Sequence, residues 1–321
     1  MSSWGLTDEQ RQCRPWGIEP QLLAPQKTIT DPIHGEVFVT ELERRIIDTR
    51  SFQRLRRIRQ LGTAHLVYPA ATNSRFSHAL GALRAAQDIL NVVLDQRNTK
   101  GHVPDIFDQW NHEARGDKNV YNERVGRAVV LCRLGALLHD IGHVPFGHTL
   151  EDDLRLLVPH DENEERFTYY WNEILKTAKI ELDEELVKYL KVLVLSGTGS
   201  ADALPRDLRF VKDPIGNTIC ADLLDYLPRD HYFSGLPAQL GSASLTARTC
   251  EKPTSASIGR ASRCACSGTT AIASTLSLSF TSISNTATSS TSGYSITMQR
   301  LPPTSCWANW YPHGTVHWQT R

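Results

Sequence analysis

Apolar residues recur at helical spacing through the middle of the chain, whereas strict alternation is confined to one short run, residues 36–39. Thr40 followed by Glu43 forms a capping box, which predicts a helix from Glu41 to Ile47. The segment 123–139 is apolar almost all round, as is typical of a buried central helix. Further helices are predicted over residues 51–60, 77–93, 164–179, 184–195 and 215–227. The predicted fold class is therefore mostly α, with one short strand.

The two ends of the chain differ from this middle zone. Residues 1–26 are polar and broken by prolines, so we expect a loose leader there rather than a signal peptide. Between Gly241 and Arg300, 26 of 60 residues are Ser or Thr, too polar a composition to offset the entropy of ordering. We interpret residues 237–321 as a disordered or non-native tail, with a shifted reading frame as the leading explanation and a natural disordered extension as the alternative. The domain that carries the chemistry is expected to span residues 27–236.

Charge and cysteine content narrow the class of protein further. Lys plus Arg and Asp plus Glu number 35 each, so the overall charge indicates no polyanionic partner. Seven cysteines lack the spacing of a disulfide framework and are expected to be reduced. No apolar run approaches the roughly 20 residues that span a bilayer. These features favour a cytoplasmic protein without a membrane partner.

The candidate chemistry lies where an apolar helix runs into His139 and Asp140. Charged groups at such a place are rarely buried unless they pair or bind a metal ion. His78 and Asp222 taken singly are also compatible with a surface or capping histidine and a solvated carboxylate. Taken together, the four side chains form a mixed nitrogen and oxygen set, which predicts one divalent ion, namely iron, manganese, zinc, cobalt or nickel, with magnesium also admissible.

Histidines that follow this pair could donate or accept protons in a reaction. Gly142 and Gly147 break the chain, so that His143 and His148 can fold back over the metal ion. A surface position is the alternative for each histidine.

His160 is followed by Asp161 and Glu162, so an imidazole–carboxylate pair is expected there. Such a pair suits a proton donor to a leaving oxygen.

Basic residues could supply the phosphate-binding half of a site, or a solvated helix face. They are Arg54, Arg56, Arg57, Arg59 and Arg75.

Several short motifs follow one another between residues 27 and 236. They are KTITDPIHG at 27–35, RIIDT at 45–49, FQRLR at 52–56, QLG at 60–62, RFSH at 75–78, HDIGHVPFGH at 139–148 and DLLDYLPRD at 222–230. This succession resembles the HD-domain metal-dependent phosphohydrolases. More narrowly, it is similar to the deoxynucleoside triphosphate (dNTP) triphosphohydrolases, which include a type that joins a sterile-alpha-motif (SAM) domain to an HD domain. The resemblance implies a helical HD-domain fold and hydrolysis of a dNTP to deoxynucleoside and triphosphate.

The resemblance also implies roles for individual residues in the reaction. The metal ligands would be His78, His139, Asp140 and Asp222. The acid/base and phosphate-contacting residues would be His143, His160, His148 and Arg75. The residues around the sugar would be Gln60, Leu61, Tyr226 and Asp230, of which Leu61 and Tyr226 would crowd a ribose 2′-hydroxyl.

A second nucleotide site is implied as well. Lys27, Asp48, Gln53 and Arg56 match positions that hold a GTP or dGTP activator at a subunit interface, so a homo-oligomer is expected. An aspartate can accept from the guanine N1–H and an arginine can donate to O6.

Departures from the family pattern keep two alternatives open. Leu223 stands where a phosphate-binding lysine occurs in the family, and Thr30 where an activator-site asparagine is common. No counterpart of the C-terminal half of the family fold is recognisable after residue 236, so an inactive chain is one expectation. The alternatives are another HD phosphohydrolase, such as a nucleotidase or phosphodiesterase, and a non-catalytic nucleotide- or nucleic-acid-binding protein.

Overall fold

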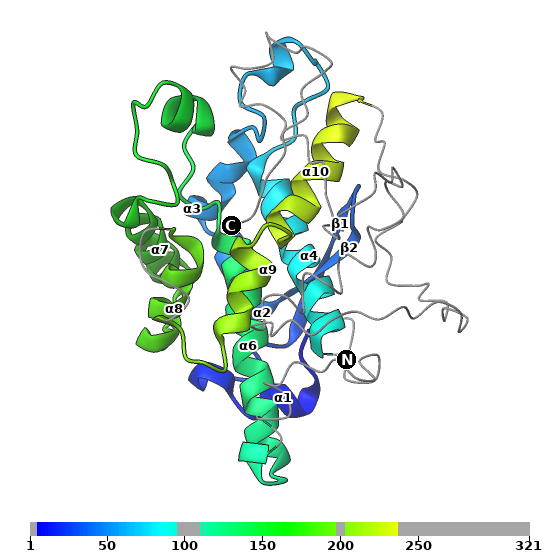
Figure 1. Cartoon of the computed structure of the whole chain (residues 1–321), viewed down its shortest axis with the longest axis vertical. Helices are drawn as coiled ribbons and strands as arrows, with labels where there is room; N and C mark the ends of the chain where they lie inside the picture. Colours follow the sequence, from blue (N-terminus) through cyan, green and yellow to red (C-terminus); the bar gives the residue numbers. More distant parts are fainter. Residues whose placement is uncertain (1–4, 95–109, 111, 197–202, 237–321) are drawn as a thin grey trace, which may run out of the picture.

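The computed structural model of the chain describes residues 5–94, 110, 112–196 and 203–236, and these residues are mostly helical (Figure 1). The α-helices are α1 Asp8–Gln12, α2 Glu41–Ile47, α3 Arg50–Gln53, α4 Arg75–Leu94, α6 Lys118–Leu138, α7 Glu164–Ala178, α8 Glu184–Val194, α9 Lys212–Gly216 and α10 Ala221–Ser234. Shorter helical turns are η1 Pro15–Gly17, η2 Arg54–Arg57, η3 Ala64–Leu66, the π-helical turn η4 Thr149–Asp153, and η6 Arg209–Val211. The predicted mostly-α class is confirmed.

Three helices, α4, α6 and α10, lie side by side at the centre of the fold (Figure 1). α6 buries an unbroken run from Ala128 to Leu138, which explains why its sequence is apolar on nearly every side. α7 and α8 lie on one side of this trio, and the β-hairpin lies on the other. The centre therefore brings together the start of α4, the end of α6 and the start of α10.

The hairpin pairs β1 Pro25–Asp31 with β2 Gly35–Thr40 in antiparallel register. Only the second strand was predicted, as residues 36–39, because the exposed polar residues of β1 hide its period. The side chain of Asp31 accepts hydrogen bonds from the backbone N–H groups of Ile33 and His34, which closes the turn. Thr40 then caps α2 in the capping box that the sequence predicts.

Two predicted helices are shorter than expected. The segment 51–60 forms α3 and the 3₁₀ turn η2 and then becomes extended at Ile58, so that Gln60 lies beyond the helix. The segment 215–227 is divided because Asn217 is extended, which separates α9 from α10. Periodicity alone does not reveal either break, since apolar residues continue on both sides.

Residues 5–26 pack onto the core instead of forming the loose leader that was expected. Leu6, Trp16 and Ile18 are all buried, and the indole of Trp16 donates a 2.9 Å hydrogen bond to the carbonyl of Arg127 on α6. The predicted tail, residues 237–321, lies outside the described residues.

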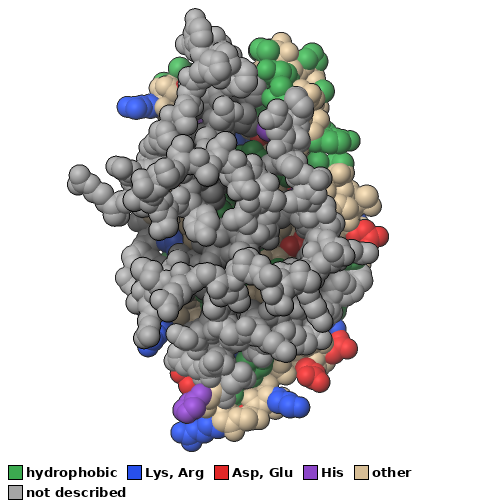
Figure 2. Space-filling model, turned by 45° about the vertical axis from the view of Figure 1, so that its right-hand side comes forward, with side chains coloured by type: hydrophobic (Ala, Val, Ile, Leu, Met, Phe, Trp, Pro, Cys, Tyr) green, Lys and Arg blue, Asp and Glu red, His purple; other side chains and the backbone are tan. Residues whose placement is uncertain are grey.

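The described side chains that are visible on one face carry charges of both signs (Figure 2). On the face shown in Figure 2, the coloured lysines and arginines are scattered and lie near acidic side chains at its lower end. Within the described ranges, no helix combines the length and the hydropathy needed to cross a bilayer.

Candidate metal centre

Side chains from three separated segments converge at the centre of the fold. His78 lies in the first turn of α4, His139 caps the end of α6, and Asp222 lies in the first turn of α10. The Nε2 atoms of the two histidines are 3.1 Å apart, and Oδ1 of Asp222 is 3.0 Å from that of His78 and 3.7 Å from that of His139. This is the spacing of a group that can hold one metal ion.

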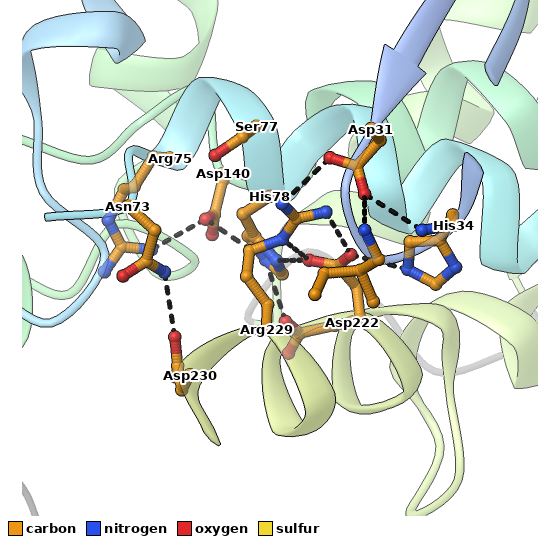
Figure 3. A network of polar contacts seen from close by, with 12 residues as sticks. Asp31, His34, Asn73, Arg75, Ser77, His78, Asp140, Asp222, Arg229 and Asp230 are labelled. Carbon is orange, nitrogen blue, oxygen red and sulfur yellow. Dashed lines mark hydrogen bonds and ion pairs between the residues drawn. The ribbon is translucent and has the colours of Figure 1, made fainter. Parts of the chain in front are cut away.

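Asp140, the fourth predicted ligand, borders this group. Its Oδ2 lies 3.5 Å from Nε2 of His78, and its Oδ1 lies 3.5 Å from Nε2 of His139. Oδ2 also accepts a 2.6 Å hydrogen bond from the buried guanidinium of Arg75 (Figure 3). Asp140 therefore contacts the ligand group on one side and a fixed cation on the other.

Hydrogen bonds at the far side of each ring show which nitrogens can bind an ion. Nδ1 of His78 lies 2.7 Å from Oδ2 of Asp225, and Nδ1 of His139 lies 2.7 Å from the carbonyl oxygen of Ala136. Because both partners only accept, each neutral ring carries its proton on Nδ1 and has its lone pair on Nε2. Two lone pairs thus face each other beside carboxylate oxygens, a donor set that fits a divalent cation.

The electrostatics of the group favour positive charge. Burial lowers the pKa of His78, but hydrogen bonds to Asp222 and Asp225 outweigh it and raise this pKa to about 10. Burial raises the pKa of Asp222, but hydrogen bonds from His139 and His78 outweigh it and hold this pKa below its ordinary value. A buried place that keeps Asp222 ionised and stabilises an imidazolium is also one that attracts a metal ion.

Three further histidines lie on the other side of Asp140. The rings of His143 and His160 stack with centroids 3.5 Å apart, and the ring of His148 meets His143 edge-on at 4.9 Å. Nε2 of His143 is 3.3 Å from Oδ1 of Asp140, and burial together with Arg75 holds the pKa of His143 well below its ordinary value. His143 is therefore neutral, next to the ligand group.

The carboxylate that pairs with His160 is Glu151, and not Asp161 or Glu162 as expected. Oε2 of the buried Glu151 is 3.1 Å from Nδ1 of His160, and its Oε1 accepts from Arg166 at 2.9 Å. Burial raises the pKa of Glu151, but the hydrogen bonds to His160 and Arg166 outweigh it and lower that pKa.

His148 forms a second imidazole–carboxylate pair. Its Nδ1 lies 2.8 Å from Oδ2 of Asp152, and both side chains are about half exposed. The spacing of four residues between them is a sequence signal that could have identified this pair.

The loop between these histidines is held by the partly buried Arg54. Arg54 donates to the carbonyls of His143 and Ile141, and the distance to the His143 oxygen is 2.5 Å. Gly142 and Gly147 lie where a Cβ atom would crowd His160 and His143 respectively. The glycines thus allow the close approach that was predicted, whereas Arg54 positions the loop and does not form part of an open basic surface.

Residues predicted around the sugar meet through Asn73, which the sequence analysis missed. The backbone N–H of Gln60 donates to the carbonyl of Asn73, and Nδ2 of Asn73 donates to Oδ1 of Asp230 at 2.9 Å. Burial raises the pKa of Asp230 to about 6. Leu61 follows Gln60, and Tyr226 lies one helical turn before Asp230 on α10.

The predicted activator residues lie at the surface. Nε of Arg56 donates to Oε1 of Gln53 at 2.7 Å, and Asp48, at the end of α2, pairs with Arg44. Lys27 is exposed on β1. The structure thus brings Gln53 and Arg56 into direct contact in this region.

Comparison with known proteins agrees with this geometry. The HD domain family matches residues 119–229, a range that holds His139, Asp140 and Asp222. The uncharacterized protein MJ1154 of Methanocaldococcus jannaschii is 32% identical over 216 residues, which are 65% of this chain and 34% of that protein.

Proteins with a stated activity are also similar. The deoxynucleoside triphosphate triphosphohydrolase SAMHD1 of Danio rerio is 28% identical over 63% of this chain and 27% of that protein. Its homolog in Dictyostelium discoideum is 28% identical over 65% of this chain and 37% of that protein. The chain thus spans about a third of the length of these relatives. Its residues 119–229 match the HD domain family, and the chain is similar to HD-domain proteins that include deoxynucleoside triphosphate triphosphohydrolases.

Proposed function

We propose that this chain hydrolyses dNTPs to a deoxynucleoside and inorganic triphosphate. The observation that carries the proposal is the convergence of His78, His139 and Asp222, with Asp140 at its border, next to two imidazole–carboxylate pairs. A divalent ion bound there would supply Lewis-acid activation of a phosphoryl oxygen and of water. Similarity to proteins named as triphosphohydrolases supports the choice of substrate.

The reaction needs one proton at the leaving oxygen. Water adds to the α-phosphorus, the bond from that phosphorus to the 5′-oxygen breaks, and the 5′-oxygen is protonated. We assign the proton to His160, because Glu151 orients its ring and its Nε2 lies 3.8 Å from Asp140, on the side of the metal centre. His143 stacks on this ring, and its Nε2 is 3.3 Å from the same Asp140 oxygen.

Positive groups would offset the charge of the triphosphate. Arg75 is buried beside Asp140, and its Nε makes no hydrogen bond within the described residues, so it has a donor to offer. His148 is half exposed and adds a second, surface-facing donor.

Two buried acceptors are available to receive the sugar hydroxyl. Oε1 of Gln60 and Oδ1 of Asn73 are buried without a donor among the described residues, and both belong to the chain of contacts that leads to Asp230. A 3′-hydroxyl is a donor that could satisfy one of these acceptors. Leu61 and Tyr226 are proposed to exclude a 2′-hydroxyl.

The remaining parts of the proposal concern regulation and context. We propose GTP or dGTP as an activator held by Lys27, Asp48, Gln53 and Arg56, a homo-oligomeric and cytoplasmic protein, and residues 27–236 as the chemical domain.

Product identity tests the proposal. The full chain, loaded with manganese, is incubated with dGTP, dATP, GTP and dGMP, with and without added GTP as activator, and the products are separated by ion-exchange chromatography. Triphosphate from the deoxynucleotides is expected, with loss of activity in Asp222→Asn and retention in Asp88→Asn, which changes an exposed ion pair on α4. Release of pyrophosphate or orthophosphate alone, or turnover of dGMP, would reject it in favour of another phosphohydrolase.

A further inference from the structure

A buried carboxylate behind the ligand group has all of its hydrogen-bonding capacity in use. Oδ2 of Asp225 accepts from Nε of Arg229 at 2.8 Å and from Nδ1 of His78 at 2.7 Å. Oδ1 accepts from Nη2 of Arg229 at 2.8 Å and from Nε2 of His34 at 2.7 Å. A carboxylate offers about four acceptor sites, so Asp225 is saturated by four donors.

We propose that Asp225 is the positioning residue of the metal centre, which orients the ring of His78 and fixes the tautomer whose Nε2 binds the ion. The inference rests on the metal site of the proposed function and gives a role to Asp225, which belongs to the motif at 222–230 but had none. Asp225 acts through His78 and touches neither the ion nor the substrate. Carboxylates behind metal-binding histidines act in this way in many metalloproteins.

The β-hairpin turn holds Asp225 in place. Arg229 is fully buried and binds Asp225 with two nitrogens and Asp31 with the third, at 2.9 Å, so that it lies between Asp31 and His78 (Figure 3). Asp31 also closes the turn that delivers His34 to Asp225. The orientation of His78 is therefore coupled to the turn between β1 and β2.

Gly81 makes the space for this arrangement. It lies three residues after His78 on α4, where a Cβ atom would overlap Oδ1 of Asp225 and lie 2.5 Å from Nη2 of Arg229. A glycine inside a helix costs about 1 kcal/mol relative to alanine, so its presence here reflects the space that the carboxylate needs.

An asparagine cannot replace this carboxylate. It has one oxygen where the aspartate has two, so in either orientation its amide group faces a nitrogen of Arg229. In one of the two orientations the amide also faces Nδ1 of His78 and favours the tautomer that carries its proton on Nε2. That tautomer has no lone pair for the ion.

Metal affinity without any nucleotide tests the inference. The affinity of the full chain for Mn²⁺ is measured by calorimetry in the wild type, in Asp225→Asn and in the control Asp88→Asn. We expect Asp225→Asn to bind Mn²⁺ about 10- to 100-fold more weakly, while Asp88→Asn equals the wild type. An affinity of Asp225→Asn within twofold of the wild type overturns the inference.

Ring nitrogen spectra by NMR give a readout that a merely structural role would not change. With Zn²⁺ bound, the wild type is expected to show His78 bound through Nε2 and protonated at Nδ1, with that proton held in the hydrogen bond to Asp225. Asp225→Asn is expected to shift or lose this Nδ1–H signal, and an unchanged signal contradicts the inference.

Gly81→Ala replaces the primary variant if Asp225→Asn does not fold. Alanine favours the helix but displaces the carboxylate, so the affinity for Mn²⁺ should fall about tenfold while the helical circular dichroism is kept. Wild-type affinity in Gly81→Ala overturns the inference.

The two proposals fail separately. A wild type that binds Mn²⁺ and releases no triphosphate rejects the hydrolysis and leaves the role of Asp225 intact. A wild type that binds no Mn²⁺ rejects both.

Discussion

Two buried polar clusters in this molecule differ in whether their donors and acceptors balance. In one, Arg133 on α6 donates to both carboxylate oxygens of Glu43, to Oε1 of Gln87 and to the carbonyl of Phe38, at 2.7–2.9 Å. Glu43 in turn accepts from the backbone N–H of Thr40. In this first cluster, each nitrogen of the guanidinium faces an acceptor.

The metal centre has the opposite balance. There the lone pairs of His78 and His139 face each other across 3.1 Å, with oxygens of Asp222 and Asp140 at 3.0–3.7 Å. Acceptors outnumber donors, and burial makes that imbalance costly unless a cation is supplied. The comparison distinguishes a polar cluster that stabilises the fold from one that is built to bind an ion.

The largest expected effect comes from removing a ligand. Asp222→Asn takes away a negative charge 3.0 Å from Nε2 of His78, and we expect Mn²⁺ affinity and triphosphate release to fall by more than about 100-fold. Calorimetry and the product assay measure both quantities, with Asp88→Asn as the matched control. Retained tight binding would show that the acceptors are not a ligand group.

Removing the carboxylate from the cluster of Arg133 and Glu43 should lower stability and leave metal binding unchanged. Glu43→Gln leaves the buried guanidinium of Arg133 without its charged partner, so the free energy of unfolding should fall by about 3–5 kcal/mol. Urea denaturation measures this loss. Mn²⁺ affinity should stay at the wild-type value.

Glu164→Gln provides the control for that experiment. Glu164 pairs with Lys191 at the surface and is about half exposed, so its loss should cost at most about 1 kcal/mol. An equal cost in both variants would remove the distinction between the clusters.

The pH dependence of stability at Asp230 tests what a buried carboxylate costs when no arginine pairs with it. Asp230 is as buried as Glu43 but accepts from an amide instead of an arginine. Its pKa is raised to about 6, above the value of about 3.9 in an unfolded chain. The stabilisation from the protonated form is complete below pH 4 and is lost as the pH rises through 6. Between pH 4 and pH 7, in EDTA, Asp230→Asn should therefore gain about 2 kcal/mol relative to the wild type.

Denaturation at several pH values measures this difference. A constant gap between Asp230→Asn and the wild type from pH 4 to pH 7 would contradict the raised pKa.

The smallest predicted effect concerns Glu151. Glu151→Gln keeps a hydrogen bond to His160 but removes the charge that pairs with its ring, so kcat should fall about tenfold or more. The affinity for Mn²⁺ should stay at the wild-type value. An unchanged kcat would exclude His160, oriented by Glu151, as the proton donor.

The sequence predicts the candidate metal ligands better than the residues that position them. His139 and Asp140 are adjacent at the end of an apolar helix, where charge is conspicuous, and the helices that deliver His78 and Asp222 are strongly periodic. Glu151 and Asp225 act through contacts between distant segments, so local pattern does not identify them. Gly81 illustrates the difference, since in sequence it is only a weak point in a helix.

The missed parts of the fold have a similar cause. Residues 5–26 were predicted to be a loose leader because prolines and polar residues surround Trp16 and Ile18 in the sequence. In the structure both side chains are buried, and Trp16 donates a hydrogen bond to Arg127 on α6. β1 was missed because its exposed face carries polar residues such as Lys27, and pairing with β2 decides its structure.

The position of a bound ion shows whether His78, His139 and Asp222 share one cation. A crystal of the full chain grown with Co²⁺ and measured at the cobalt edge locates the ion by its anomalous scattering. The account predicts one ion about 2.0–2.2 Å from Nε2 of His78, Nε2 of His139 and an oxygen of Asp222. An ion held only by Asp140, His143 and His160, the other group of suitable side chains in the described residues, would contradict it.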